Sequence, residues 1–149
     1  MADEVLRLSL DKFTFLVPQE LHYNDAGVWV RIEGRRARVG ISDFAQQRSG
    51  DIAFATVTAA GTALRPGDEL AGIETVKVNL SLPCPVKGTI VEINTALEQA
   101  AELINQDPYG AGWMAVLELD DWESDRGRLL DAKAYLAPIK EQAEEELEP

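Results

Sequence analysis

The sequence has few of the residues that build metal, redox and catalytic sites. It contains one cysteine, Cys84, and one histidine, His22. A single cysteine excludes an intramolecular disulfide and a cysteine metal cluster, and a single histidine excludes a multi-histidine metal site. Histidine-based catalytic relays and Gly-rich phosphate loops are missing as well. Acidic pairs such as Asp120-Asp121 are present, but 26 acidic residues produce such neighbours by chance. Most catalytic templates are therefore excluded.

Positive charge and long apolar runs are also scarce. Lys and Arg number 14 against 26 Asp and Glu, so the net charge is −12. Phosphate backbones and anionic membrane surfaces are bound by basic patches, so we expect neither nucleic acid nor membrane as a partner. The longest run without a charged residue, 52–64, is too short to span a bilayer. The N-terminus lacks the basic start and apolar run of a signal peptide. These absences predict a soluble, cytoplasmic protein.

The length and the spacing of apolar residues predict one mainly β domain. With 149 residues, 46% of them hydrophobic, the chain is long enough to bury a core without disulfides. Segments of alternating apolar residues predict about seven short strands, which points to a barrel or sandwich edged by helices. The expected strands cover 28–32, 37–41, 52–57, 70–76, 79–82, 89–93 and 113–119.

The remaining segments predict short helices and two flanking regions. A helix is expected to begin after Ser42 as its N-cap and to end at Gly50, and another is expected over 94–104. Residues 1–20 form a lead-in with a short strand near 13–17. Residues 129–149 form a C-terminal helix and an acidic tail, in which Pro138 is expected to kink or break the helix.

Lys77 has the most informative surroundings of any charged residue. It lies between two strand-like segments, at the tip of an expected hairpin, with Val76 and Val78 beside it and Glu74 three residues earlier. Residues 72–77, Gly-Ile-Glu-Thr-Val-Lys, resemble the lipoylation hairpin of the glycine cleavage system H protein family, which typically reads G-x-V-E-S-V-K. A biotin carrier would be expected to have methionines beside the lysine instead of these valines.

Further segments resemble the same family in the same order, so that the match spans roughly residues 20–140. These segments are 29–34, 39–46, 50–54, 85–88, 91–94, 103–113 and 129–135. The resemblance implies a barrel-sandwich hybrid of the lipoyl and biotinyl carrier type, a monomer, and a non-catalytic subunit of a multi-enzyme system. It also implies a lipoate joined by an amide bond to Lys77, with Glu74, Val76 and Val78 read by a lipoate ligase or a lipoyl synthase and transferase.

The sequence departs from the family where the family places acids for a cationic aminomethyl cargo. Val28 replaces the acid of a His-Glu-Trp segment, and Leu80 and Ser81 replace a Ser-Asp pair after the lysine. Asp25 is a nearby acid that offers an alternative source of charge. The candidates for a cargo pocket are therefore Val28, Leu80, Ser81 and Cys84.

Three functions follow from these departures. With these neutral positions, the sequence resembles the H-like lipoate-binding proteins that serve bacterial sulfur oxidation with a heterodisulfide-reductase-like complex. Sulfur intermediates are therefore the first candidate cargo. The alternative is the glycine cleavage carrier, whose partners are glycine decarboxylase, aminomethyltransferase and dihydrolipoamide dehydrogenase. The third is a lipoyl donor or an interaction module without cargo.

Overall fold

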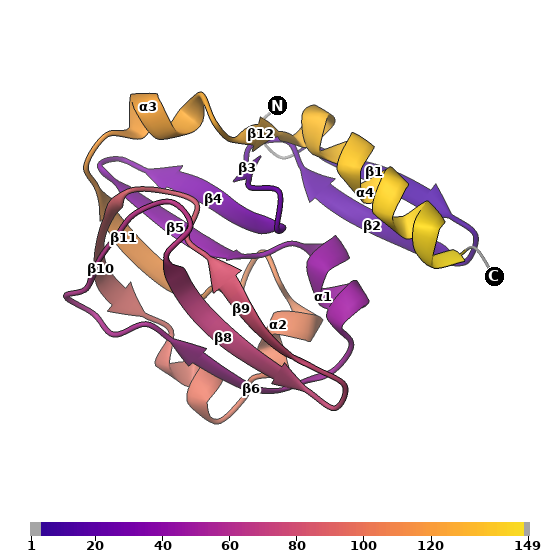
Figure 1. The fold of residues 1–149 in the computed structure, drawn as a ribbon, viewed down its shortest axis with the longest axis horizontal. Coiled ribbons are helices and arrows are strands. Elements are labelled where there is room, and N and C mark those ends of the chain that lie inside the picture. The colour runs from indigo at the N-terminus through magenta and orange to yellow at the C-terminus, as the bar shows by residue number, and fades with distance from the viewer. Residues whose placement is uncertain (1–3, 148–149) are drawn as a thin grey trace.

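The computed structural model describes residues 4–147 and is built mainly from antiparallel strands (Figure 1). The strands are β1 Val5–Leu10, β2 Phe13–Pro18, β3 His22–Tyr23, β4 Val28–Glu33, β5 Arg36–Ile41, β6 Ile52–Val57, β7 Ala63–Leu64, β8 Glu69–Thr75, β9 Asn79–Pro83, β10 Gly88–Ile93, β11 Ala115–Leu119 and β12 Leu130–Asp131. The helices are α1 Asp43–Ser49, the 3₁₀ turn η1 Thr95–Glu98, α2 Leu103–Gln106, α3 Trp122–Arg126 and α4 Ala132–Leu147. Residues 1–3 of the expected lead-in and 148–149 of the expected tail lie outside the described residues.

Three sheets build the fold. One has seven strands in the order β12-β3-β4-β5-β11-β10-β7, one has three in the order β6-β8-β9, and the third is the β1-β2 hairpin. The seven-stranded and three-stranded sheets enclose the main core, and α4 lies along the hairpin at one end (Figure 1). This arrangement confirms the mainly β barrel-sandwich prediction.

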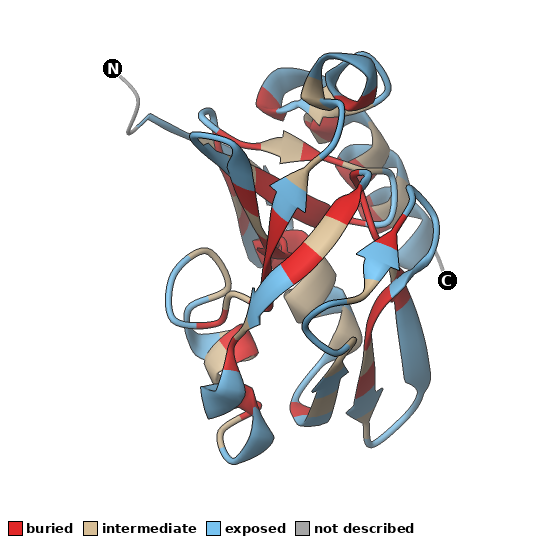
Figure 2. Cartoon of the chain, turned by 90° about the vertical axis from the view of Figure 1, so that its left-hand side faces the viewer, coloured by how far each residue is buried: buried red, intermediate tan, exposed pale blue. Residues whose placement is uncertain are grey.

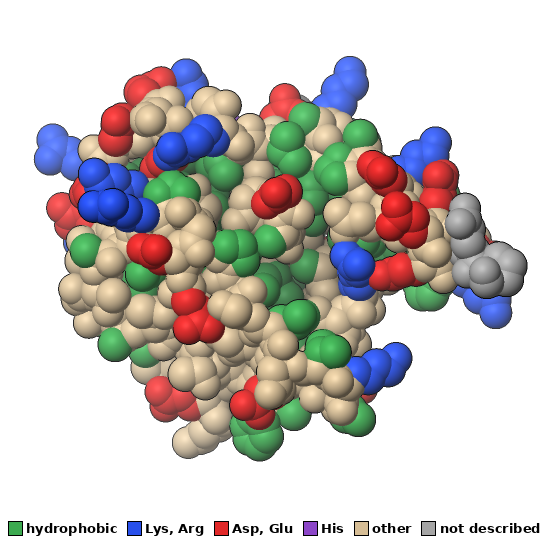
Figure 3. Space-filling view, in the orientation of Figure 1, with side chains coloured by type: hydrophobic (Ala, Val, Ile, Leu, Met, Phe, Trp, Pro, Cys, Tyr) green, Lys and Arg blue, Asp and Glu red, His purple; other side chains and the backbone are tan. Residues whose placement is uncertain are grey.

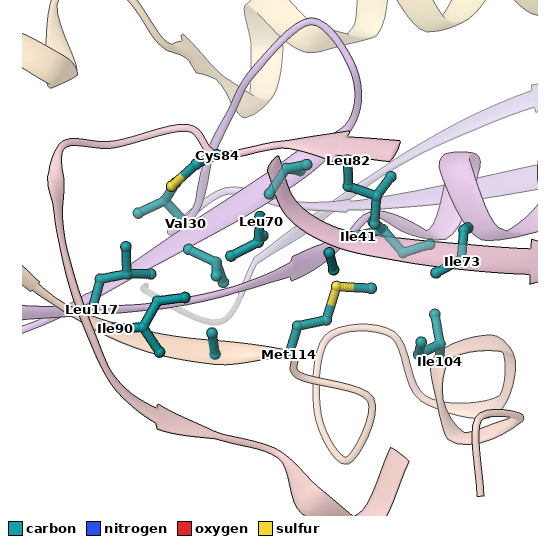
Figure 4. Close-up of a cluster of buried hydrophobic side chains, with 14 of the residues drawn as sticks. Val30, Ile41, Leu70, Ile73, Leu82, Cys84, Ile90, Ile104, Met114 and Leu117 are labelled. Carbon is teal, nitrogen blue, oxygen red and sulfur yellow. The ribbon is translucent and has the colours of Figure 1, made fainter. Parts of the chain in front are cut away.

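The main core is formed by the inner faces of these two sheets. Val30 and Ile41 come from the large sheet, and Ile73 and Leu82 from the small one (Figure 4). Each is nearly or fully buried, and burying such a side chain stabilises the fold by roughly 1.5–3 kcal/mol. The colouring by exposure shows the same division, with buried positions alternating along the strands and exposed positions at the hairpin ends (Figure 2).

A second core joins α4 to the N-terminal hairpin. Tyr135 and Ile139 of α4 pack with Val17 of β2 and Trp29 of β4, and the Tyr135 ring stacks on the Tyr23 ring at 4.5 Å between centroids. The hairpin is also tied to α1, because the Leu16 N–H donates a hydrogen bond to the buried Asp43 carboxylate at 2.9 Å. The segment expected to be a lead-in is therefore part of a packed layer.

Most local predictions match the observed elements. The Ser42 side chain caps α1 by accepting a hydrogen bond from the Ala45 N–H, and Gly50 ends the helix. The helix expected over 94–104 is instead divided into η1 and α2, because Asn94 caps η1 and Gln99 already ends it. The helix α4 continues through Pro138. Proline there removes one main-chain hydrogen bond and its ring crowds the carbonyl four residues earlier, but burial of Tyr135 and Ile139 on either side holds the helix in place.

None of the helices described within residues 4–147 is long and apolar enough to cross a membrane.

Candidate functional site

A tight hairpin between β8 and β9 presents Lys77 to solvent. The last strand pair is Glu74 opposite Asn79, and residues 75–78 form the turn. The Thr75 N–H donates a hydrogen bond to the Val78 carbonyl at 2.9 Å. The Thr75 hydroxyl oxygen accepts hydrogen bonds from the N–H groups of Lys77 and Val78, at 3.2 and 3.1 Å. One threonine thus fixes the conformation of the tip.

The residues of this tip suit a covalently attached acyl group. Lys77 is exposed, and no carboxylate among the described residues forms an ion pair with it. Its amine is therefore accessible for acylation. Val76 is 95% exposed and Val78 is 46% exposed. Because exposed valines at a turn contribute little to packing, these two side chains are available for contact with another molecule.

An apolar cleft of about 390 Å³ lies beside the hairpin. Its walls come from three regions that are far apart in the sequence: Val78 of the turn and Leu80 of β9, Phe44 of α1, and Tyr135 and Ile139 of α4. In the space-filling view, hydrophobic side chains gather in a hollow between the sheets and the end of the molecule that carries α4 (Figure 3). The apolar part of the cleft offers a surface on which an apolar chain attached to Lys77 can lie.

Two charged side chains line this cleft. Asp25 stands at its rim on the turn before β4, where the Asn24 side chain accepts hydrogen bonds from the N–H groups of Ala26 and Val28. Gly27 has φ of +87°, and an added Cβ would lie 2.8 Å from the Tyr135 hydroxyl. This position therefore requires glycine, and the glycine keeps the turn close against α4.

Arg48 is the other charged residue that lines the cleft. Its guanidinium donates hydrogen bonds to Gln142 and Glu146 of α4, and it lies 6.0 Å from the centre of the Phe44 ring. These contacts hold α1 and α4 together across the cleft. The sequence did not single out Arg48, because its partners lie almost a hundred residues further along the chain.

The predicted pocket residues fall in two different places. Leu80 and Ser81 line the cleft, and the Ser81 hydroxyl donates a hydrogen bond to Glu69 at 2.8 Å. Val28 and Cys84 are buried in the main core, where Cys84 lies beside Val30 (Figure 4), and neither is among the residues that line the cleft. Burial raises the pKa of the Cys84 thiol to about 11, so it is protonated near neutral pH.

The fold and this site define a class of protein. An antiparallel barrel-sandwich that holds a lysine at the tip of a projecting hairpin, beside an apolar cleft, is the architecture of a lipoyl carrier. In that class the cofactor supplies the chemistry and the protein positions it.

Comparisons with known proteins identify the family. The family model for glycine cleavage H-protein matches residues 21–142. The glycine cleavage system H protein of Symbiobacterium thermophilum is 44% identical over 84% of this chain and 97% of that protein. The protein of the same name from Bacteroides thetaiotaomicron is 43% identical over 82% of this chain and 96% of that protein. A crystal structure of a glycine cleavage system H protein from Mycobacterium marinum superposes with a TM-score of 0.71, at 28% identity over 81% of this chain and 97% of that chain.

The chain belongs to the glycine cleavage H-protein family. Proteins of this family are non-catalytic carriers that bear lipoate covalently on a lysine. The β1-β2 hairpin precedes the residues that the family model matches.

Proposed function

We propose that Lys77 is the lipoylated lysine and that the chain carries an aminomethyl group for glycine cleavage. The observation that carries this proposal is the apolar cleft beside an exposed hairpin lysine, with the Asp25 carboxylate on its rim. The curated relatives described above are all named for glycine cleavage. The enzymes that act with this carrier would then be glycine decarboxylase, aminomethyltransferase and dihydrolipoamide dehydrogenase.

The chain's own residues have three tasks in this function. A bound lipoyl group supplies a dithiol that accepts, holds and passes on a group. The apolar walls, such as Phe44 and Ile139, exclude water from an attached chain. The Asp25 carboxylate stabilises a cationic amine near the rim by charge-assisted hydrogen bonding. Thr75 fixes the tip, so that Glu74, Val76 and Val78 present one constant shape to a lipoate ligase or transferase.

Sulfur oxidation is the second candidate function. It is favoured by Leu80 and Ser81, which are neutral where the family has an acid, and by Arg48, which brings a cation to the cleft. A cation and neutral side chains suit an anionic or uncharged sulfur cargo, delivered to a heterodisulfide-reductase-like complex. The names of the relatives and the carboxylate of Asp25 make glycine cleavage the better supported of the two.

The attachment site is tested by mass spectrometry of the protein isolated from its own host. We expect a lipoyl increment on the peptide that contains Lys77. The Lys77→Arg variant should lose this increment without a change in thermal stability, because the side chain is exposed. Lys133→Arg, an exposed lysine on α4, is the matched control and should remain lipoylated. A wild-type protein with a bare Lys77 would refute the carrier proposal and leave the third alternative, an interaction module.

The same spectra distinguish the cargoes. An aminomethyl adduct on the lipoyl group supports glycine cleavage. Additional sulfur or a sulfur oxoanion on it would instead support sulfur oxidation. Transfer of lipoate from this chain to other carriers would indicate a lipoyl donor.

Asp25→Asn tests the electrostatic part of the proposal. We expect the rate of aminomethyl loading by glycine decarboxylase to fall about two- to fivefold, the range of a partly exposed ion pair. The loss should shrink at high salt. Asp51→Asn changes an exposed acid that does not line the cleft and should leave the loading rate unchanged. Equal rates for the two variants would mean that Asp25 does not contact the cargo.

A further inference from the structure

The outer face of the small sheet, on the side away from the core, has a hollow of about 430 Å³. The strand register places Phe54, Glu74 and Asn79 in one row across β6, β8 and β9, and Thr56, Gly72 and Ser81 in the next. Gly72 has no side chain, and the nearest atoms to a Cβ built there are 3.8 Å away. The missing side chain in the central strand therefore leaves the floor of the hollow open.

The hollow is acidic and rich in hydroxyl groups. Glu69 and Glu74 both line it, together with Thr56, Thr58 and Ser81. The carboxylate of Glu69 is held by the Ser81 hydroxyl at 2.8 Å, and the Thr58 hydroxyl donates to the Glu69 carbonyl at 2.8 Å. Among the residues described as lining the hollow, none is basic. This surface is complementary to a lysine or arginine side chain.

Phe54 makes the same face attractive to a protein partner. Its side chain is 65% exposed, and it lies directly opposite Glu74 in the strand register. Val76, at the hairpin tip, is 95% exposed. An exposed aromatic ring next to a charged hollow is the composition of an interaction hot spot, where large side chains anchor a partner.

We propose that this outer face is the docking surface of the enzyme that attaches lipoate, and that the enzyme covers Phe54 and places a basic side chain in the hollow over Gly72. The inference rests on the proposed lipoylation of Lys77 and adds β6 and Glu69 to the recognition surface. In the attachment reaction, the Lys77 amine forms an amide bond with the carbonyl carbon of an activated acyl donor. The donor's leaving group departs with its bonding electrons, and the nitrogen releases a proton to solvent.

Position favours this enzyme over those that use the attached arm. Acylation takes place at Nζ of Lys77, close to the row that contains Phe54 and Glu74. Enzymes that act on the dithiol work at the far end of the arm, beyond the lysine side chain and the acyl chain. Contacts so close to the lysine therefore serve the attachment step.

The test compares initial rates at which a purified lipoate ligase, supplied with ATP and lipoate, acylates the unmodified protein. For Phe54→Ala we expect kcat/KM to fall about tenfold or more, as for an aromatic hot spot. Phe13→Ala is the matched control, because Phe13 is 47% exposed and lies on the N-terminal hairpin, and it should acylate at the wild-type rate. Equal rates for the two variants would overturn the proposal.

Charge is tested separately with Glu69→Gln. We expect a lower kcat/KM and a shallower decrease with added salt than in the wild type, since an attractive charge pair is removed. Glu92→Gln, on β10 of the other sheet, is the control and should keep the wild-type salt dependence. A Glu69→Gln variant with an unchanged salt dependence would contradict a basic side chain in the hollow.

A last measurement distinguishes the enzyme that attaches lipoate from the enzymes that use the attached arm. It also distinguishes failure of the docking proposal from failure of the proposed lipoylation of Lys77. Phe54→Ala protein that has been fully lipoylated should be reduced by dihydrolipoamide dehydrogenase, supplied with NADH as the reductant, at the wild-type rate. A matching loss in this second reaction would show that the face serves enzymes that use the arm, and would overturn the inference. Failure of the wild type to be acylated at Lys77 would refute the proposed function instead, so the two failures differ.

Discussion

His22 is the one histidine of the chain and lies where a charge is unfavourable. Its ring contacts the Trp122 ring edge-on at 5.0 Å between centroids, and its Nδ1 is buried without a hydrogen-bond partner among the described residues. Burial and the nearby Arg126 lower the pKa of His22, while Asp131 opposes the shift. The imidazole is therefore neutral in the folded protein near neutral pH.

This lowered pKa predicts acid-dependent stability. In the unfolded chain His22 takes up a proton near pH 6.5, whereas the folded protein resists protonation until a lower pH. The contribution of His22 to stability is therefore complete above pH 6.5 and is lost as the pH falls through the folded pKa. We expect the melting temperature of the wild type to decrease between pH 7 and 5 more than that of His22→Gln. Parallel pH profiles for the two proteins would contradict this account.

At the same scale, the candidate site was predictable only in part. Glu74, Val76, Lys77 and Val78 lie within five consecutive residues, so a short motif is enough to place them on one hairpin. Arg48 and Tyr135 reach the cleft from separate helices, and no local pattern indicates that they meet. Cys84 is close to Lys77 in sequence, yet it is buried in the core. It follows the end of β9 that lies away from the hairpin tip, where the chain packs against the core.

At the scale of elements, α4 depends on the N-terminal hairpin. Its buried residues Tyr135, Ile139 and Ala143 pack in the second core with β2 and β4, and its Tyr135 hydroxyl contacts Ser42 at 2.9 Å. Since α4 also forms one wall of the cleft, the hairpin that precedes the matched family region supports the site indirectly.

Truncating Ile139 tests this dependence. The side chain is fully buried, so Ile139→Ala should lower the free energy of unfolding by about 2–5 kcal/mol, the range for a large-to-small core substitution. Ile32→Ala removes the same atoms from a side chain that is 37% exposed and should cost far less. Denaturant titration measures both. Similar losses in the two variants would mean that α4 is only loosely docked.

The elements that sequence patterns predicted are those whose signals are local. The hairpin over 28–41 and the helix α1 follow from alternation and from the Ser42 cap. The strand β1 and the helix α3 were missed. The burial of β1 alternates only between exposed and half-buried positions, and α3 is a single short turn. Strand β1 pairs with the adjacent β2, but its half-buried leucines pack against the second core, to which the distant α4 contributes. Likewise, Trp122 of α3 packs against the main core. These tertiary contacts are not visible in a local pattern.

At the scale of the whole molecule, the two cores share strand β4. Its residues Val28 and Val30 belong to the main core, whereas Trp29 between them belongs to the second. Neighbouring residues on a strand point to opposite faces, so one strand is packed on both sides. Unfolding of either core would expose one face of β4 to solvent. It would also destabilise the strand on which the other core packs.

This sharing predicts a single cooperative transition, which would support the prediction of one domain over 1–149. Fluorescence of Trp29 reports on the second core, and fluorescence of Trp122, which packs against the main core, reports on the main core. We would make variants that keep only one of these tryptophans, with the others changed to Phe. Within each variant, the denaturation midpoint measured by fluorescence should equal the midpoint measured by circular dichroism. Different midpoints within one variant would indicate two separately unfolding parts.

The burial of Cys84 has a consequence for any dithiol carried on Lys77. A reactive thiol in the same molecule would form an internal mixed disulfide with the lipoyl group and displace the group that it carries. Here the one thiol of the chain is enclosed in the core, donates a hydrogen bond to the Val86 carbonyl, and stays protonated because burial raises its pKa to about 11. Because the single thiol of the chain is buried, a dithiol attached to Lys77 would exchange only with thiols or disulfides of another molecule.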